Sequence, residues 1–198
     1  MNTSDFPSVA VTACTRQRPR GLARLLTGLA NQDYAGSLRV VLVDNDPSES
    51  ARPLSADFRR KLDIEYLTER RAGIPYARNT AIEALEADDL IAFIDDDETP
   101  RSNWLRELVG TQRRHQADAV TGPVEPIFEE PPPSWVKRGH FFARRTLATG
   151  TRVDRVYTHN LLLTRETVER HRPLIADRIL TPNHSALRQV QPLGEVSV

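Results

Sequence analysis

Cysteine is almost absent from this chain of 198 residues, which contains only Cys14. A single cysteine excludes an internal disulfide framework and a zinc site built from several thiolates. We interpret Cys14 as a small buried residue at the end of the first strand rather than as a nucleophile. No apolar run approaches the roughly 20 residues of a transmembrane helix, and residues 1–8 lack the basic start and apolar core of a signal peptide. The sequence therefore predicts a cytoplasmic protein, at most peripheral to a membrane.

Glycine-rich phosphate loops are also missing. Neither a G-x-G-x-x-G loop nor a Walker-type loop is present, which removes the main support for dinucleotide-binding and P-loop proteins. Basic and acidic residues number 27 each, so the formal net charge is zero. No overall electrostatic attraction therefore favours binding to nucleic acid or to an acidic membrane surface. With 39% hydrophobic and 27% charged residues, the composition is that of an ordinary globular chain, long enough to bury one core.

What the sequence does contain is an alternation of strands and helices. Short apolar strands are expected at 9–12, 38–43, 64–67, 90–94 and 119–122. Helices are expected from about 20 to 32, from 73 to 85 and around 104–109, the first of them because Leu22, Leu25, Leu26 and Leu29 form one apolar stripe. Strands separated by helices predict an α/β fold with a mostly parallel central sheet and helices on both faces.

The remainder of the chain has a different character. Three consecutive prolines within 126–133 predict an extended surface loop. Two short strands at 153–157 and 161–163 and a short helix at 165–171 are expected to follow. Residues 176–198 show no periodicity, so we expect one domain over 1–175 and an irregular, poorly ordered tail over 176–198.

An apolar strand that ends in Asp95, Asp96 and Asp97 is the most informative feature. Adjacent carboxylates repel one another, and at the carboxyl end of a strand in an α/β sheet they suit a site at which a cation neutralises them. Carboxylate oxygens favour Mg²⁺ or Mn²⁺ carrying a phosphate group. The alternative interpretation is a solvated acidic turn before the next helix.

Other polar residues are expected at the same edge of the sheet. Thr12 follows the first predicted strand and Asp44 follows the second. Asp44 suits a hydrogen bond from a nucleotide base or ribose, or alternatively a bond to its own turn. Arg78, with Arg70 and Arg71, flanks the start of a helix whose N–H groups favour anions. The alternative, above all for Arg70 and Arg71, is a solvated basic loop.

Four segments together resemble family-two glycosyltransferases of the GT-A fold. They are the opening Val9–Pro19, Val41–Asn45, Gly73 with Ala77–Asn79, and Phe93–Asp97, in that order and spacing. The resemblance covers about residues 8–175 and implies a Rossmann-like α/β sandwich that binds a nucleotide-diphosphate sugar.

The resemblance also implies roles for individual residues. By position, Thr12 and Asp44 are implied to contact the base, Arg78 to lie on the nucleotide side, and Asp95 and Asp96 to face the ribose and diphosphate. Asp97 is implied to be the ligand of Mn²⁺ or Mg²⁺. Residues 122–124 resemble the strand under the donor sugar, and 158–163 resemble the strand that precedes the acceptor half.

The general base is where the resemblance stops. Inverting members of the family usually supply it from a Glu-Asp pair after that strand, and none follows here; Asp177 and His184 are weak substitutes.

From the resemblance we expect a metal-dependent, inverting glycosyltransferase acting on a hydroxyl of a glycan, lipid-linked or small-molecule acceptor. The alternative is a non-catalytic nucleotide-binding protein or a truncated remnant that transfers sugar poorly. A nucleotidyltransferase is less well supported, because its first loop would be rich in glycine and carry a lysine.

Overall fold

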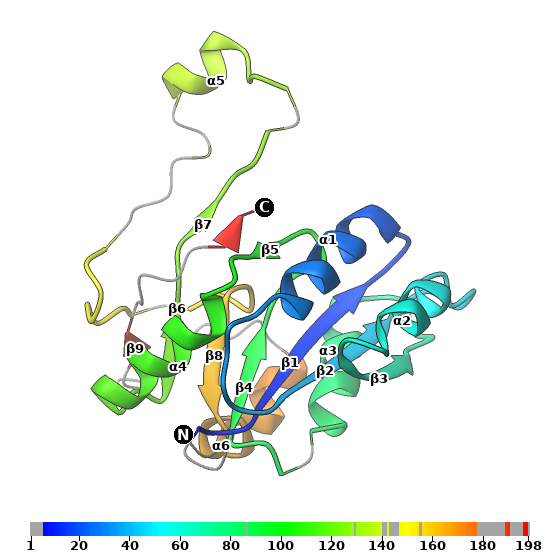
Figure 1. Ribbon diagram of the computed structural model, residues 1–198, viewed down its shortest axis with the longest axis horizontal. Coiled ribbons are helices and arrows are strands. Elements are labelled where there is room, and N and C mark those ends of the chain that lie inside the picture. The colour runs from blue at the N-terminus through cyan, green and yellow to red at the C-terminus, as the bar shows by residue number, and fades with distance from the viewer. Residues whose placement is uncertain are drawn as a thin grey trace.

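The computed structural model describes residues 6–85, 87–128, 130–139, 142, 147–154, 156–177, 189–190 and 196–197. Within these residues the main sheet has seven strands in the order β3-β2-β1-β4-β8-β6-β9 (Figure 1). Their bounds are β1 Val9–Thr15, β2 Leu38–Asp44, β3 Asp63–Thr68, β4 Leu90–Phe93, β6 Ala119–Thr121, β8 Leu161–Thr164 and β9 Gln189–Val190. A smaller sheet pairs β5 (Thr99–Pro100), β10 (Val196–Ser197) and β7 (Val124–Glu125).

Most strands of the main sheet are parallel, as predicted. β1 pairs in parallel with β2 and β4, and β2 with β3. β8 is the exception, because it runs antiparallel to both of its neighbours, β4 and β6. The sheet is therefore mixed, and the chain enters β8 at the edge where β1, β2 and β4 end.

Helices cover both faces of the sheet. One core cluster packs α1 (Pro19–Ala30), α2 (Arg52–Phe58) and α4 (Trp104–His115) against one face. The other face is covered by α3 (Ile74–Glu83) and α6 (Arg165–Asp177). Because side chains alternate along each strand, Val40 and Leu42 face α1 while Val41 and Val43 face α3. This two-sided burial explains why the strands read as continuous apolar runs.

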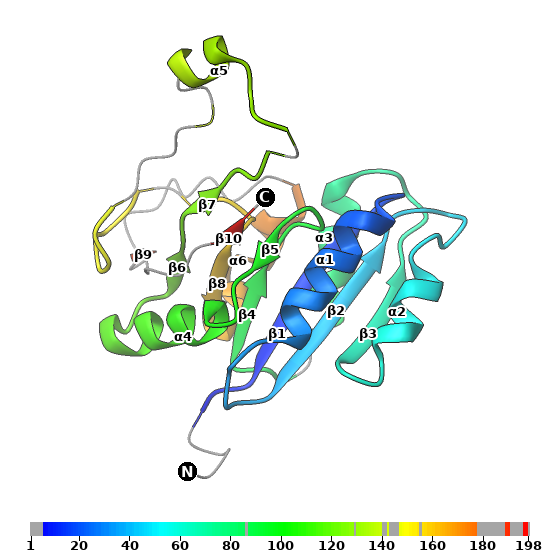
Figure 2. The same cartoon turned by 45° about the horizontal axis from the view of Figure 1, so that its top comes forward.

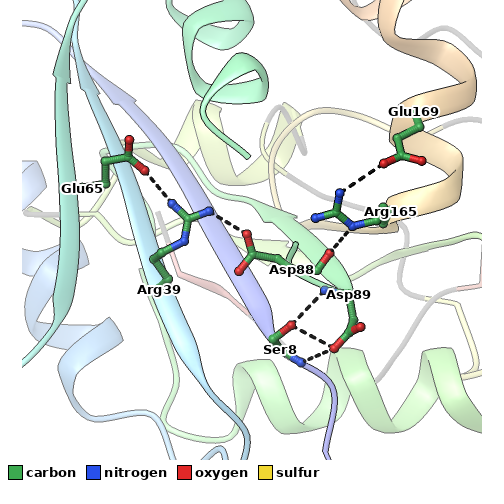
Figure 3. Close-up of polar contacts among 7 residues, drawn as sticks. All are labelled: Ser8, Arg39, Glu65, Asp88, Asp89, Arg165 and Glu169. Atoms are coloured by element: carbon green, nitrogen blue, oxygen red, sulfur yellow. Dashed lines mark hydrogen bonds and ion pairs between the residues drawn. The ribbon is translucent and has the colours of Figure 1, made fainter. Parts of the chain in front are cut away.

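A polar network joins the strand ends that lie opposite the triple aspartate. Arg39 on β2 is paired with Glu65 and Asp88 at 2.6 Å each. Figure 3 shows the three side chains. The neighbouring Asp89 accepts hydrogen bonds from the backbone and hydroxyl of Ser8. Arg165 at the start of α6 donates to the Asp88 carbonyl at 2.7 Å. These hydrogen bonds and ion pairs connect the turn before β4 to the start of β1, to β2 and to α6.

Several expected boundaries are wrong. β1 continues to Thr15, three residues beyond the predicted end, because Ala13–Thr15 pair in register with β2. α2 was not expected at all, and α6 extends to Asp177 rather than to 171. None of the described residues in 153–157 lies in a strand. Residues 189–190 and 196–197 form short strands within the tail expected to be irregular, most of which lies outside the described residues.

The proline-rich segment is extended, as predicted, and leads to the short helix α5 (Ser134–Gly139). This segment and α5 reach away from the main sheet in both views (Figures 1 and 2). Ile127, Phe128 and Trp135 on it are exposed. Within the described residues, no helix has the length and apolar character needed to cross a bilayer.

Candidate functional site

A cleft of about 480 Å³ opens at the edge where β1, β2 and β4 end. It is lined by Cys14, Thr15, Arg16, Arg18, Asn45, Gly73, Ile74, Ala77, Arg78, Asp95, Asp96 and Asp97. These residues come from the ends of three strands, the start of α3 and the turn before α1. The carboxyl edge of a parallel sheet is where α/β folds build ligand sites. Of the predicted residues, Arg78, Asp95, Asp96 and Asp97 line this cleft.

Arginines neutralise the three aspartates. Arg18 donates to Asp97 at 2.8 Å and to Asp96 at 3.1 Å, and Arg78 approaches Asp95 at 3.4 Å. Thr15 adds a hydrogen bond to Asp96 at 2.8 Å. Burial nevertheless raises the pKa of the Asp95 and Asp96 carboxyls above their usual range, and these partners oppose that rise.

The three carboxylates differ in exposure. The Asp96 side chain is only 6% exposed, whereas those of Asp95 and Asp97 are each 44% exposed. Asp96 therefore anchors the turn, and the other two present oxygens to the cleft.

A close backbone approach fixes the turn against α1. A Cβ added at Gly21 would lie 2.6 Å from the carbonyl oxygen of Asp96. Only glycine allows α1 to pack this closely on the turn, since real Cβ atoms do not approach oxygen to that distance. The first turn of α1 thus packs directly on the acidic turn through Gly21.

Asn45 organises the opposite wall of the cleft. Its side-chain amide donates to the carbonyls of Glu69 and Arg71 at 2.8 and 2.7 Å, and its side-chain oxygen accepts from Gly73 N at 2.9 Å. Gly73 has a φ of 138°, which strongly favours glycine, and precedes the first turn of α3. These bonds present the N-terminus of α3, with its N–H groups, to the cleft.

Two predicted site residues do not line the cleft. Thr12 lies inside β1, 3% exposed, and its hydroxyl donates to the Ala92 carbonyl at 3.2 Å. Asp44 is fully buried and accepts hydrogen bonds from Ala51 N and the Tyr66 hydroxyl, both at 2.8 Å. Their neighbours along the chain, Thr15 and Asn45, reach the cleft instead. Base contacts by Thr12 and Asp44 stay predictions.

The other predicted residues fall into two groups. Arg78, Asp95, Asp96 and Asp97 come together in the cleft. Asp177 is the last residue of α6, whose side chain is not described, and His184 lies outside the described residues.

Sequence analysis missed the importance of Glu98. Its side chain is 3% exposed, accepts a hydrogen bond from Asp95 N at 3.1 Å and lies 3.6 Å from His159 Nδ1. Burial raises the pKa of Glu98 to about 8. A carboxyl this deeply buried supports the acidic turn from beneath and does not face the cleft.

Cys14 lines the cleft as a free, half-buried thiol. Burial raises its pKa to about 12, with the Arg78 charge opposing the rise. A thiol that stays protonated is a poor nucleophile, in agreement with the sequence interpretation.

Asp95 and Asp97 are the residues of the cleft that could hold a divalent cation. The described residues hold no group of three or more His, Cys, Asp or Glu side chains arranged for a metal. Mg²⁺ and Mn²⁺ are commonly bound by one or two carboxylates, with substrate phosphates supplying further oxygens. Two half-exposed carboxylates at the cleft match that mode of binding.

Two curated proteins are similar to this chain in sequence. The chain is 35% identical over 162 residues to the "Succinoglycan biosynthesis protein ExoM" of Rhizobium meliloti, covering 80% of this chain and 52% of that protein. It is 31% identical over 126 residues to "Glycosyltransferase AglE" of Haloferax volcanii, covering 62% and 41%. The chain thus spans about half the length, or less, of these curated relatives.

Solved structures show the same fold. The structure of S. aureus TarS 1-349 in complex with UDP-GlcNAc matches with a TM-score of 0.71 at 15% identity, over 96% of this chain and 58% of that one. The complex of the same protein with UDP matches with a TM-score of 0.69 at 17% identity, over 96% and 60%. These matches confirm the predicted α/β sandwich of the GT-A type.

The family is settled by sequence. The profile described as "Glycosyl transferase family 2" matches residues 8–172, nearly the whole span over which the motifs resemble that family. The chain belongs to glycosyl transferase family 2.

Proposed function

We propose that this chain binds a nucleotide-diphosphate sugar in the cleft and transfers the sugar to an acceptor hydroxyl, with inversion. The observation that carries the proposal is the meeting of Arg18, Arg78 and the N-terminus of α3 with the acidic turn in one cleft. The TarS structures with UDP-GlcNAc and UDP, and the family itself, support a nucleotide-sugar donor.

The cationic groups of the cleft would bind the diphosphate. Arg78 is only 17% exposed, and it extends from α3 toward Asp95. A buried guanidinium near a helix N-terminus forms charge-assisted hydrogen bonds to phosphate oxygens. Arg18 is 57% exposed and can turn from the aspartates to the ligand.

Asp97, with Asp95, would hold the divalent cation. When bound, Mn²⁺ or Mg²⁺ supplies positive charge that stabilises the departing diphosphate. Without a cation, the two exposed carboxylates would repel that diphosphate. Asp96 keeps the turn in place through Thr15 and Arg18.

Titration calorimetry with UDP, with and without Mn²⁺, tests the donor site. We expect binding that requires Mn²⁺ and a loss of most affinity in Asp97→Asn. Asp33→Asn is the matched control, because Asp33 is also paired with an arginine and its side chain is 40% exposed. Equal UDP affinity with and without Mn²⁺ would contradict the role of the cation.

A second candidate function is nucleotide binding without transfer. It is favoured by one observation: the buried carboxyl of Glu98, next to the acidic turn, is not accessible to an acceptor hydroxyl. A positioned base contributes about 10²–10⁴-fold to rate, so a protein without one would bind donor and transfer little. Release of UDP from UDP-glucose, UDP-galactose and UDP-GlcNAc, with and without added glycosides, separates the two functions.

A further inference from the structure

Tyr157 and His159 form a stacked pair beside the acidic turn. Their ring centroids are 5.6 Å apart and the ring planes are inclined by only 12°. Tyr157 is 54% exposed, whereas the His159 side chain is 27% exposed. His159 therefore backs the tyrosine ring, and much of the tyrosine surface is left open to solvent.

Asn160 follows this pair directly along the chain. It is fully buried, with a φ of 44° in the left-handed region, and donates to the Pro123 carbonyl at 2.9 Å. It also accepts a hydrogen bond from Trp104 Nε1 at 2.8 Å. A non-glycine residue with a positive φ is strained and needs such hydrogen bonds from its surroundings. Residues in this conformation are typical of functional segments. The backbone next to the ring pair is thus anchored at the entry to β8.

The pair flanks the acidic turn on the side away from the cleft. His159 Nδ1 lies 3.6 Å from Glu98 Oε1, and Glu98 in turn accepts from Asp95 N. In the sheet, β8 and β1 lie on opposite sides of β4. The cleft is built on the β1 and β2 side, so the ring pair and the cleft meet only at the acidic turn.

We propose that the open ring of Tyr157, backed by His159, stacks against a pyranose ring of the acceptor. This inference rests on the proposed function, in which the nucleotide fills the cleft and leaves the β8 side of the turn for the acceptor. A pyranose presents a face of C–H groups to an aromatic ring and hydroxyls at its rim. The exposed ring of Tyr157 offers such a surface, since aromatic rings favour contacts with apolar faces.

Saturation-transfer NMR tests the platform directly. The probes are the methyl glycosides of glucose, galactose, mannose, N-acetylglucosamine and glucuronic acid, each with and without UDP and Mn²⁺. At least one glycoside should bind the full chain, and its affinity should fall about tenfold in Tyr157→Ala. Tyr157→Phe keeps the ring and should keep the affinity. Trp135→Ala removes another exposed aromatic ring, on α5, and should have no effect.

The outcomes are distinct. Retained glycoside binding in Tyr157→Ala, an equal loss in Tyr157→Phe or Trp135→Ala, or no binding of any glycoside by the wild-type chain would each overturn the platform. Unchanged UDP affinity in Tyr157→Ala shows that the variant is folded and that the loss is local. Failure of UDP to bind the wild-type chain, with glycoside binding intact, would overturn the donor site and not the platform.

Discussion

Arg18 occupies the place beside the acidic turn where a cation is expected. Its guanidinium touches Asp96 and Asp97, and those two carboxylates raise the pKa of Arg18 in return. Three adjacent carboxylates need a positive charge nearby, and an arginine from the turn before α1 provides one. Cation and arginine would therefore compete for Asp97.

Replacing Arg18 with alanine should reveal that competition. Without the guanidinium, two carboxylates lose a nearby positive charge, and Mn²⁺ alone should bind about tenfold more tightly by a surface Coulomb estimate. UDP affinity in the presence of Mn²⁺ should fall, because a phosphate partner is lost. Mn²⁺ titration by electron paramagnetic resonance measures the first effect and calorimetry the second.

Arg106→Ala is the control for that experiment. Arg106 is 54% exposed and pairs with Asp33, which resembles the pairing of Arg18 with Asp97. It should change neither affinity. A weaker Mn²⁺ affinity in Arg18→Ala would contradict the placement of the cation at Asp97.

Gly21 gives a second test at the scale of one residue. Gly21→Ala places a Cβ 2.6 Å from the Asp96 carbonyl, so α1 or the turn must shift. We expect a loss of about 1–3 kcal/mol in unfolding free energy, as for other overpacked sites, together with weaker UDP binding. Urea unfolding and calorimetry measure both.

Gly110→Ala is matched to this variant. Gly110 lies within α4, and nothing comes within 4 Å of a Cβ placed there. Because alanine is the better helix former, that substitution should stabilise by up to about 1 kcal/mol. Equal stability of the two variants would show that the close packing of α1 on the turn is not needed.

At the scale of elements, the sequence predicted the parts of the fold that depend on local patterns. The leucine stripe of α1 and the apolar run of β4 were recognised because burial against the sheet imposes their periodicity. The acidic turn was recognised because three adjacent carboxylates are unusual after such a strand.

Features that depend on distant contacts were not predictable. The antiparallel direction of β8 depends on its pairing with β4 and β6, far away in the sequence. β1 extends to Thr15 because β2 continues alongside it, so Thr12 was placed at a strand end that it does not occupy. α2 spans only seven residues and is joined to β2 by the buried Asp44, which accepts from Ala51 N.

The loop from β3 to α3 offers a test of stability. Glu69 accepts hydrogen bonds from Arg71 N at 2.7 Å, from the Arg71 side chain, and from the Thr80 hydroxyl at 2.8 Å. The Arg71 side-chain bond is the largest cause that lowers the pKa of Glu69 from 4.5 to about 2. Because the pKa of Glu69 is lower in the folded chain, its ionised carboxylate stabilises the fold at pH values above the ordinary pKa of 4.5. This stabilisation is lost as the pH falls from 4.5 toward about 2.

Glu69→Gln should therefore destabilise the protein in a pH-dependent way. We expect a loss of about 1–3 kcal/mol near neutral pH, from hydrogen bonds to a charged group. The difference from wild type should shrink toward about pH 3, where the wild-type stabilisation itself declines. Urea unfolding near neutral pH and at about pH 3 measures the difference in unfolding free energy between Glu69→Gln and wild type. Glu125→Gln, on an exposed pair with Arg101, should change little at either pH.

At the scale of the whole molecule, the site is assembled from distant parts of one fold. The cleft is built from the ends of β1, β2 and β4 and from the starts of α1 and α3. At the opposite edge of the sheet, Arg39 and Arg165 both contact Asp88 and so connect β2, the turn before β4 and α6 (Figure 3). A ligand that contacts several of these elements at once binds only the folded chain. Donor binding should consequently stabilise the entire fold.

Thermal unfolding measures this coupling. With UDP and Mn²⁺ at 100 times the dissociation constant, a site present only in the native state contributes about 2.7 kcal/mol. For a chain of this length that corresponds to an increase in Tm of about 5–10 °C. UDP without Mn²⁺ should give a much smaller increase, and Asp97→Asn should abolish the difference between the two conditions. Asp33→Asn should behave as wild type. An equal increase with and without Mn²⁺ in the wild-type chain would place the diphosphate away from the acidic turn, and the assignment of Asp97 would then be wrong.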